Sequence, residues 1–220
     1  MQFMQNNGVT LENGVNALGN ININGGKISI YSNDDGIHAD GVLTISDGII
    51  DITKSYEGLE GLQVIINNGD ISIVSSDDGI NSTATSGQGI VIDGGNLYIL
   101  AGGDGLDSNS RTAYSGIVFK GGKTVVISTS GGNSAIDTEA GYTYTSGSVL
   151  AIMPNGGMTS EATHCSNFSS VAKKISMSLS SGKTLTVSVS NSAILSVKIP
   201  CNLSLSLIHI SEPTRHWAIS

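Results

Sequence analysis

The sequence predicts an all-β protein: a right-handed, single-stranded parallel β-helix with C-terminal antiparallel strands as a cap. A phrase made of an acidic residue or Asn, a small residue and an aliphatic residue recurs about every 22 residues. Each of the first five copies is followed by an alternating strand, a two-residue turn and a second alternating strand. One repeat of this length cannot bury its own apolar face, whereas stacked repeats share a continuous interior. The blades of a propeller or the hairpins of a β-sandwich would not give so regular a period of single rungs.

The recurring phrase aligns the rungs residue by residue. Its copies are Asn13-Gly14-Val15, Asp35-Gly36-Ile37, Glu57-Gly58-Leu59, Asp78-Gly79-Ile80 and Asp104-Gly105-Leu106, with a degraded copy at Ser134-Ala135-Ile136. Successive rungs lie about 4.8 Å apart, so aligned aliphatic residues are expected to form inward ladders. Three ladders begin at Val15, Ile21 and Ile23. The other two are Ile28, Ile50, Ile71, Leu97 and Val125, and Ile30, Ile52, Ile73, Ile99 and Ile127.

A second turn falls at one place in every rung and supports the same alignment. It reads Gly25-Gly26, Asp47-Gly48, Asn68-Gly69, Gly94-Gly95 and Gly121-Gly122. Gly, Asn and Asp adopt a positive φ at little cost, so these pairs are expected to turn the chain between two strands.

Three segments are expected along the chain: β-helix rungs over 8–155, a loop and capping strands over 156–204, and a non-native tail over 205–220. Within the second segment, the Ser- and Thr-rich stretch 158–171 predicts a loop. The alternating runs 175–179, 184–189 and 194–199 predict antiparallel strands that cover the open end of the helix and protect its edge.

The tail from Leu205 onward resembles the translation of a DNA-sequencing adaptor; the alternative is an ordinary C-terminal strand. We expect it to be non-native, and such a segment is set aside in reasoning about fold and function. The only Trp, Trp217, and two of the four His residues lie there, so they carry no functional expectation. Truncation of the gene is expected at this end, and missing upstream rungs would account for a start, 1–7, without a signal-peptide pattern.

Composition and charge disfavour several classes of protein. The net charge is −8 and the 10 Lys and Arg residues form no basic cluster, so binding to nucleic acid is not expected. No apolar run is long enough to span a bilayer, so membrane insertion is not expected either. Cys165 and Cys201 are too few for a disulfide framework; they form either one bridge or two buried thiols.

Acidic residues recur at matching positions of the repeat and predict a metal site. Those before the recurring small residue are Asp34, Asp35, Glu57, Asp77, Asp78 and Asp104, and those after it are Asp40, Glu60, Asp107 and Asp137. In stacked rungs these side chains fall along one edge, where like charges about 5 Å apart repel. Ca²⁺ accepts roughly six to eight oxygen ligands and removes that repulsion, so we expect calcium there, bound by all of these residues except Asp137.

The alternative is a solvated acidic edge on which Asp and Asn side chains only shape turns. His38 lies among the carboxylates, but a single His does not indicate zinc.

Three consecutive phrases resemble a family of bacterial carbohydrate-binding β-helix domains. They are Asp34-Asp35-Gly36-Ile37-His38-Ala39-Asp40, Ser55-Tyr56-Glu57-Gly58-Leu59-Glu60-Gly61 and Ser76-Asp77-Asp78-Gly79-Ile80-Asn81. Segments 130–137 and 161–165 resemble the family as well. The resemblance implies a secreted protein that binds calcium and a ligand such as cellulose or polygalacturonate, with a fold similar to that of pectate-lyase-like polysaccharide lyases. It also implies calcium at Asp35, Glu57, Asp78 and their neighbours.

The expected function is non-catalytic, calcium-dependent binding of extracellular polysaccharide by a monomer, outside the cell or at its surface. Sugar rings stack on aromatic side chains, and the outward candidates are Tyr31, Tyr56, Tyr98, Tyr114, Tyr142 and Tyr144. Tyr56 and Tyr98, with Lys54 and Lys120, are the expected ligand-binding residues.

Two other functions stay open. In a structural or adhesion module of the cell surface, calcium would stiffen the rungs without any glycan being bound. A polysaccharide lyase needs calcium to acidify a proton beside a uronate carboxylate and a base to remove it, and only Lys54 and Lys120 are rung lysines near acidic turns. Arg111 is the only Arg before the tail, so no Arg cluster supports a lyase. No catalytic residue is therefore predicted, and an enzyme is not expected.

Overall fold

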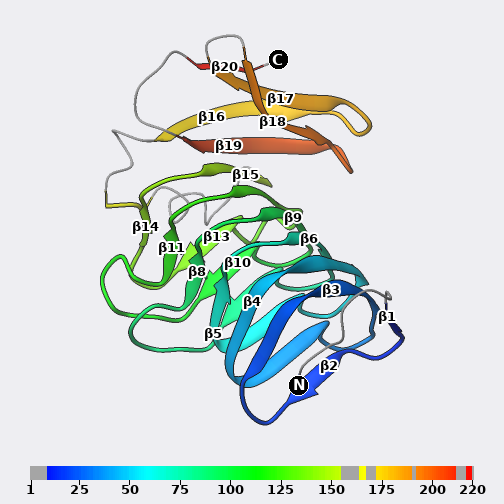
Figure 1. The fold of residues 1–220 in the computed structure, drawn as a ribbon. Coiled ribbons are helices and arrows are strands. Elements are labelled where there is room, and N and C mark those ends of the chain that lie inside the picture. Colours follow the sequence, from blue (N-terminus) through cyan, green and yellow to red (C-terminus); the bar gives the residue numbers. More distant parts are fainter. Residues whose placement is uncertain (1–8, 155–163, 167–171, 190–191, 212–216, 220) are drawn as a thin grey trace.

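The chain coils into a parallel β-solenoid of about six turns, which antiparallel strands cover at one end (Figure 1). The computed structural model describes residues 9–154, 164–166, 172–189, 192–211 and 217–219. These residues form strands, turns and loops and include no helix, so the predicted all-β parallel solenoid with a cap is confirmed. No helix long and apolar enough to cross a membrane occurs among them.

Strands β1 to β15 build the solenoid. They are β1 Val9–Leu11, β2 Val15–Ala17, β3 Ile21–Tyr31, β4 Ile37–Lys54, β5 Leu59–Ile66, β6 Asp70–Ser75, β7 Ile80–Ser82, β8 Ile90–Ile92, β9 Asn96–Ala101, β10 Leu106–Ser108, β11 Ile117–Phe119, β12 Lys123–Ser128, β13 Ile136–Thr138, β14 Tyr142–Tyr144 and β15 Ser148–Pro154. Parallel pairing arranges them in three series: β2–β4–β5–β7–β10–β13, β3–β4–β5–β8–β11–β14 and β1–β3–β4–β6–β9–β12–β15. Strands β3, β4 and β5 pass around corners and so belong to more than one series.

The register confirms the predicted ladders in the first rungs. Val15 pairs with Ile37, and the same ladder continues through Leu59, Ile80 and Leu106 to Ile136. The ladders that begin at Ile21 and Ile23 are likewise in register, and their side chains are buried in the interior. Each aliphatic side chain removed from water contributes about 1.5–3 kcal/mol, so the stacked columns are the main source of stability.

The ladder positions predicted in β12 are wrong by one residue. Thr124 pairs with Leu97, so Thr124 and Val126 face the interior while Val125 and Ile127 face outward. The two outward residues are nevertheless buried, because the cap covers them. A strand that is covered on both faces carries apolar residues throughout, so alternation in its sequence does not reveal which face is the interior.

Glycine has two distinct roles in the rungs. In the recurring phrase the rungs approach closely: a Cβ added to Gly36 would lie 2.6 Å from the carbonyl oxygen of Gly58. At the second turn the requirement is a positive φ, which ranges from 73° to 127° at Gly26, Gly48, Gly69, Gly95 and Gly122. The predicted turns are therefore confirmed.

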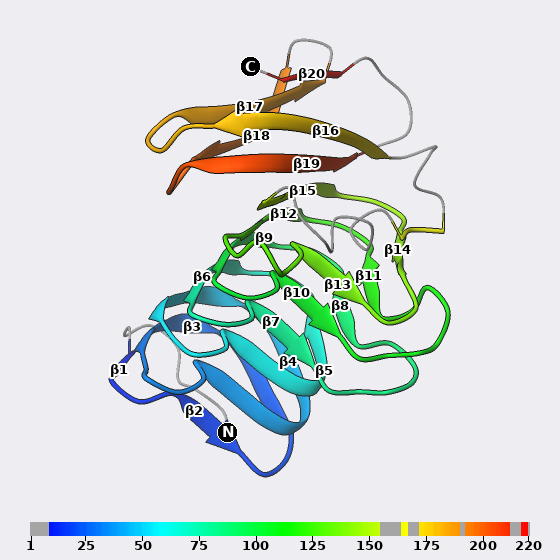
Figure 2. The ribbon, with the colours of Figure 1, turned by 180° about the vertical axis from the view of Figure 1, so that it is seen from behind.

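Strands β16 to β20 form the cap (Figure 2). They are β16 Ala172–Leu179, β17 Thr184–Val189, β18 Ser192–Lys198, β19 Leu203–Ser211 and β20 Trp217–Ile219. Pairing is antiparallel throughout, as predicted: β17 pairs with β18 and β20, and β19 lies between β15 and β16. Cap residues such as Leu185 and Val187 join Val125 and Ile127 in a second buried cluster outside the solenoid. The predicted loop 158–171 lies outside the described residues except at 164–166.

Strand β19 includes part of the tail that the sequence predicts to be non-native. The backbone from Leu205 to Ser211 pairs with β15, and Leu205 to Ile210 pairs with β16 as well. This segment therefore contributes hydrogen bonds to the cap in the present chain, while its non-native origin stays a prediction.

Two expected surface tyrosines lie in the interior instead. Tyr142 and Tyr144 are buried and extend the inward ladders of Ile117 and Phe119. Tyr142 packs edge-on against Phe119, and the Tyr144 hydroxyl donates to the Gly147 carbonyl oxygen at 2.8 Å. A buried tyrosine is acceptable where its hydroxyl has a partner, so the expectation that these two face outward is wrong.

The two cysteines are not joined by a disulfide, and both are partly buried thiols. Cys165 packs against the solenoid interior and Cys201 against the second cluster.

Candidate functional site

Two ladders of polar side chains run along one edge of the solenoid. The turn ladder precedes the small residue of each phrase and consists of Asp35, Glu57, Asp78 and Asp104. The strand ladder lies three residues further along and consists of Asn16, His38, Glu60, Asn81, Asp107 and Asp137. Parallel pairing keeps both ladders in register, which places side chains of successive rungs about 4.8 Å apart.

In the turn ladder, one carboxylate oxygen of Asp35 and one of Asp78 accept backbone hydrogen bonds from the next rung. Asp35 Oδ1 accepts a hydrogen bond from the Glu57 backbone N–H at 3.1 Å, and Asp78 Oδ1 accepts one from the Asp104 backbone N–H at 2.7 Å. Each carboxylate thereby ties its own rung to the next one. The second oxygen of each carboxylate takes no part in this bond and can meet another partner.

His38 stands at the centre of the first carboxylate cluster. Its Nε2 lies 3.0 Å from Asp40 Oδ1, its Nδ1 lies 3.2 Å from Asp35 Oδ2, and Nδ1 also contacts Glu60 Oε2. Burial alone lowers the pKa of His38, but hydrogen bonds to Asp40 and Asp35 and the charge of Glu60 raise it above its ordinary value. The ligand atoms of Asp35, His38 and Glu60 lie within 4.8 Å of one another, close enough to share a metal ion in place of a proton.

The following rungs form a second group, which we call the oxygen cluster: Glu57, Asp78, Asn81 and Asp107. Burial, followed by the charge of a neighbouring glutamate, raises the pKa of Glu57 to about 7, although Asn81 Nδ2 donates to both of its oxygens at 3.2 and 3.1 Å. Burial, followed by the charges of Asp78 and other carboxylates, raises the pKa of Asp107 to about 8. Without a cation, these carboxylates are therefore driven toward their protonated forms.

An unsatisfied acceptor lies in the oxygen cluster. Asn81 Oδ1 is buried and has no hydrogen-bond partner among the described residues. Leaving a buried acceptor unpaired costs roughly 1–3 kcal/mol. A hard cation would satisfy this oxygen and at the same time remove the repulsion between Glu57 and Asp107. The donor atoms of the oxygen cluster are of the type that Ca²⁺ prefers, whereas Asp35, His38 and Glu60 are the one group of three among the described residues whose ligand atoms all lie within 4.8 Å of one another.

The predicted metal ligands divide into ladder and rim residues. The ladders include Asp35, Glu57, Glu60, Asp78, Asp104 and Asp107. Asp34 is exposed at the rim, and Asp40 contacts the first cluster through His38. The neighbouring carboxylate of Asp77 is the main cause of a raised pKa of Tyr56.

The four predicted ligand-binding residues do not converge on one site. Lys54 Nζ donates to Asn33 Oδ1 at 2.6 Å and lies 5.0 Å from the ring centre of Tyr31. Lys120 is ion-paired with Asp93 at 3.1 Å, in a turn that follows β11. Tyr56 lies at the acidic rim, whereas Tyr98 lies on the outer face of β9 beside the cap.

Three residues of the edge lie outside the predicted ligand set: His38, Asn81 and Asp137. All belong to the strand ladder, three residues after the residue that opens each phrase. That constant offset is present in the sequence and could have identified them. Charge alone does not, because Asn81 is neutral and His38 interrupts the run of acids.

Fold and edge together define a parallel β-solenoid with one edge rich in carboxylate and amide oxygens. A family model described as carbohydrate-binding domain-containing protein matches residues 4–88 and 63–202. These overlapping matches cover most of the chain, which therefore belongs to this family. No curated protein and no solved structure matches the chain. Family membership makes carbohydrate the class of partner and favours a module without a catalytic role.

Proposed function

We propose that the chain is a non-catalytic module of the cell surface or extracellular space that binds polysaccharide in a calcium-dependent way. The observation that carries the calcium part is the oxygen cluster. It combines two carboxylates of strongly raised pKa, Glu57 and Asp107, with the buried, unpaired oxygen of Asn81. The carbohydrate part rests on family membership.

Calcium suits the oxygen cluster better than the His38 cluster. Around His38 the imidazole contacts Asp35, Asp40 and Glu60, and its raised pKa favours the positively charged form, which offsets their charge. No comparable cationic side chain contacts Glu57 or Asp107 among the interactions of the described residues. Ca²⁺ prefers carboxylate and amide oxygens, which is the donor chemistry of these rungs.

A bound calcium ion would act on glycan binding in two ways. It would neutralise an edge that otherwise repels anionic sugars, and it could bridge ladder carboxylates to the carboxylate of a uronate unit. Asp34 and Asp77 lie at the rim, where a ligand approaching from solvent would meet them.

A calcium-stiffened structural module is the second candidate, and one observation favours it. Asp35 and Asp78 each tie one rung to the next through a backbone hydrogen bond. A cation on their second oxygens would reinforce the same links without any glycan. A lyase has no comparable support, since Lys54 and Lys120 are both engaged by neighbouring side chains.

The test is retention of the full chain on insoluble cellulose and on cross-linked polygalacturonate, with calcium and with a chelator. Retention that requires calcium supports the proposal. Calcium-dependent melting without retention on either polymer would favour the structural module. Absence of unsaturated uronate products, followed by ultraviolet absorbance, is expected, and their formation would contradict a non-catalytic role.

A further inference from the structure

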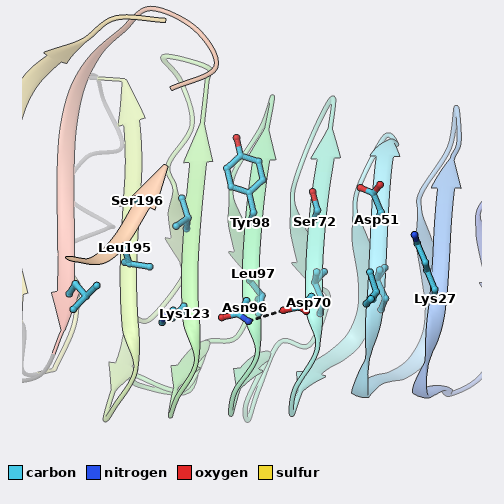
Figure 3. A pocket seen from close by; sticks show the side chains of 15 residues that line it. Lys27, Asp51, Asp70, Ser72, Asn96, Leu97, Tyr98, Lys123, Leu195 and Ser196 are labelled. Atoms are coloured by element: carbon cyan, nitrogen blue, oxygen red, sulfur yellow. Dashed lines mark hydrogen bonds between the residues drawn. The ribbon is translucent and has the colours of Figure 1, made fainter. Parts of the chain in front are cut away.

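A groove crosses the outer face of the solenoid, away from the acidic edge. It has a volume of about 660 Å³ and extends over β3, β4, β6, β9 and β12. Leu195 and Ser196 of β18 close it at the cap end (Figure 3). None of the ladder carboxylates lines it. Its size lies within the range of roughly 300–1,000 Å³ that is usual for ligand sites.

Two rows of outward side chains form the floor of the groove. One row is Lys27, Ile49, Asp70, Asn96 and Lys123, and the other is Asp51, Ser72, Tyr98 and Val125. The strand spacing sets the length of the rows: four spacings from β3 to β12 give about 19 Å. The groove is therefore long enough for several linked sugar units rather than for one.

The floor combines apolar surface with hydrogen-bonding groups. Ile49 is apolar although it lies at an outward position, where it is 48% exposed. The half-buried Tyr98 presents part of its ring. Between them, Asp70 accepts a hydrogen bond from Asn96 at 2.7 Å, which leaves further acceptor and donor capacity on both side chains. A sugar ring has the matching amphipathic character, with a C–H face and a rim of hydroxyl groups.

The charges in the groove balance. Lys27 and Lys123 lie in its two end strands, and Asp51 and Asp70 lie between them. A chain of uronates would meet two carboxylates in the middle of its path, which disfavours it. An uncharged chain avoids this repulsion and can use the same carboxylates as hydrogen-bond acceptors for its hydroxyls.

We infer that this groove binds an uncharged polysaccharide chain lying across β3 to β12, with its end against β18. The inference rests on the proposed carbohydrate-binding function and assigns it a second surface. Calcium contributes to this surface only through the stability of the rungs, because the ladder carboxylates are not part of the lining.

The test compares Ile49→Asp with Leu62→Asp in the full chain at saturating calcium. Leu62 has the same exposed fraction, 48%, but lies outside the groove, so the two changes cost the fold a similar amount. We expect Ile49→Asp to weaken binding to swollen cellulose about tenfold and Leu62→Asp to change it by less than about twofold. Ser72→Trp, which fills the groove, should act like Ile49→Asp, while calcium-dependent retention on polygalacturonate stays unchanged in all three variants.

Equal binding of Ile49→Asp and Leu62→Asp to cellulose overturns the groove as a glycan site and leaves the proposed function intact. If the unmodified chain binds none of the polymers, the proposed function is contradicted instead. If Ile49→Asp converts a dimer to a monomer in sedimentation and leaves cellulose binding unchanged, the occupant is a second copy of the chain, which also overturns the inference.

Discussion

The side-chain amide nitrogen of Asn81 donates to both carboxylate oxygens of Glu57 on the neighbouring rung, at 3.2 and 3.1 Å. The amide oxygen on the same side chain is buried and has no partner among the described residues. Asn81 thus holds a carboxylate of raised pKa in place and presents an unsatisfied acceptor beside it. This combination is expected where a cation, rather than a proton, completes the site.

Replacement of Asn81 by Asp tests that arrangement directly. In a chelator we expect Asn81→Asp to lower the free energy of unfolding by about 2 kcal/mol, because it removes two donors from Glu57 and adds a like charge. Calcium should restore most of the loss, since Asp still offers oxygen ligands. The control is Asn16→Asp, an exposed position of the same ladder paired with His38, where urea unfolding should change by less than about 0.5 kcal/mol. Equal effects of the two variants would contradict the assignment.

The two tasks of Asp78 can be separated by substitution. Asp78→Asn keeps an oxygen that accepts the Asp104 backbone N–H and removes the charge, whereas Asp78→Ala removes both. Without calcium, we expect the Asn variant to be as stable as the unmodified chain or more stable, and the Ala variant to lose about 1–3 kcal/mol. With calcium, the gain in melting temperature should shrink in both variants. An undiminished gain would show that Asp78 does not bind the cation.

Stability of the metal-free protein should fall as pH rises. The pKa values of Glu57 and Asp107, about 7 and about 8, exceed their ordinary values of 4.5 and 3.8. Each group therefore takes up a proton on folding in the pH range between its ordinary and its raised pKa. Where the folded state binds more protons than the unfolded state, the free energy of unfolding decreases with increasing pH. The raised pKa of His38 acts in the same direction, since its contribution is lost as pH rises through the folded value.

The measurement is the melting temperature in chelator and in saturating calcium from about pH 4 to about pH 8. We expect a decline in chelator and a much flatter curve in calcium, which replaces the protons. A melting temperature that rises with pH in chelator would show that the carboxylates are not destabilised by burial and mutual repulsion.

The close approach of rungs predicts a strong effect of a single methyl group. A Cβ on Gly58 would overlap the Gly79 carbonyl oxygen and the Ile73 side chain, whereas a Cβ on Gly19 would meet nothing within 4 Å. We expect Gly58→Ala to destabilise by about 1–3 kcal/mol and Gly19→Ala to stay within about 0.5 kcal/mol of the unmodified chain. Denaturant titration of both variants decides, and a tolerated Gly58→Ala would contradict the rung spacing.

Removal of the tail should affect the cap. A chain that ends at Ser204 lacks most of β19 and exposes the paired edges of β15 and β16. A chain that ends at Ser211 keeps the strand and serves as the control. We expect the shorter chain to melt at a lower temperature and to bind more of a hydrophobic dye, because β15 and β16 lose the strand that pairs with both of them. Identical melting of the two chains would show that the segment adds nothing to the fold.

The period of the sequence by itself determined the rungs, the inward ladders from Val15, Ile21 and Ile23, and the acidic edge. Stacked repeats contact only their neighbours in register, so the position of a residue in the phrase specifies what lies above and below it. The place of Asp78 next to Asp104 therefore follows from the repeat alone.

Only the tertiary structure decided which residues depart from this rule. Val125 and Ile127 face outward because the cap, which does not repeat, covers them. The pKa values of Glu57 and Asp107, the central place of His38 and the groove beside β18 depend on burial and on contacts between segments that share no period. Burial is a property of the assembled chain, so a repeating sequence specifies where its side chains stack but not which of them lose water.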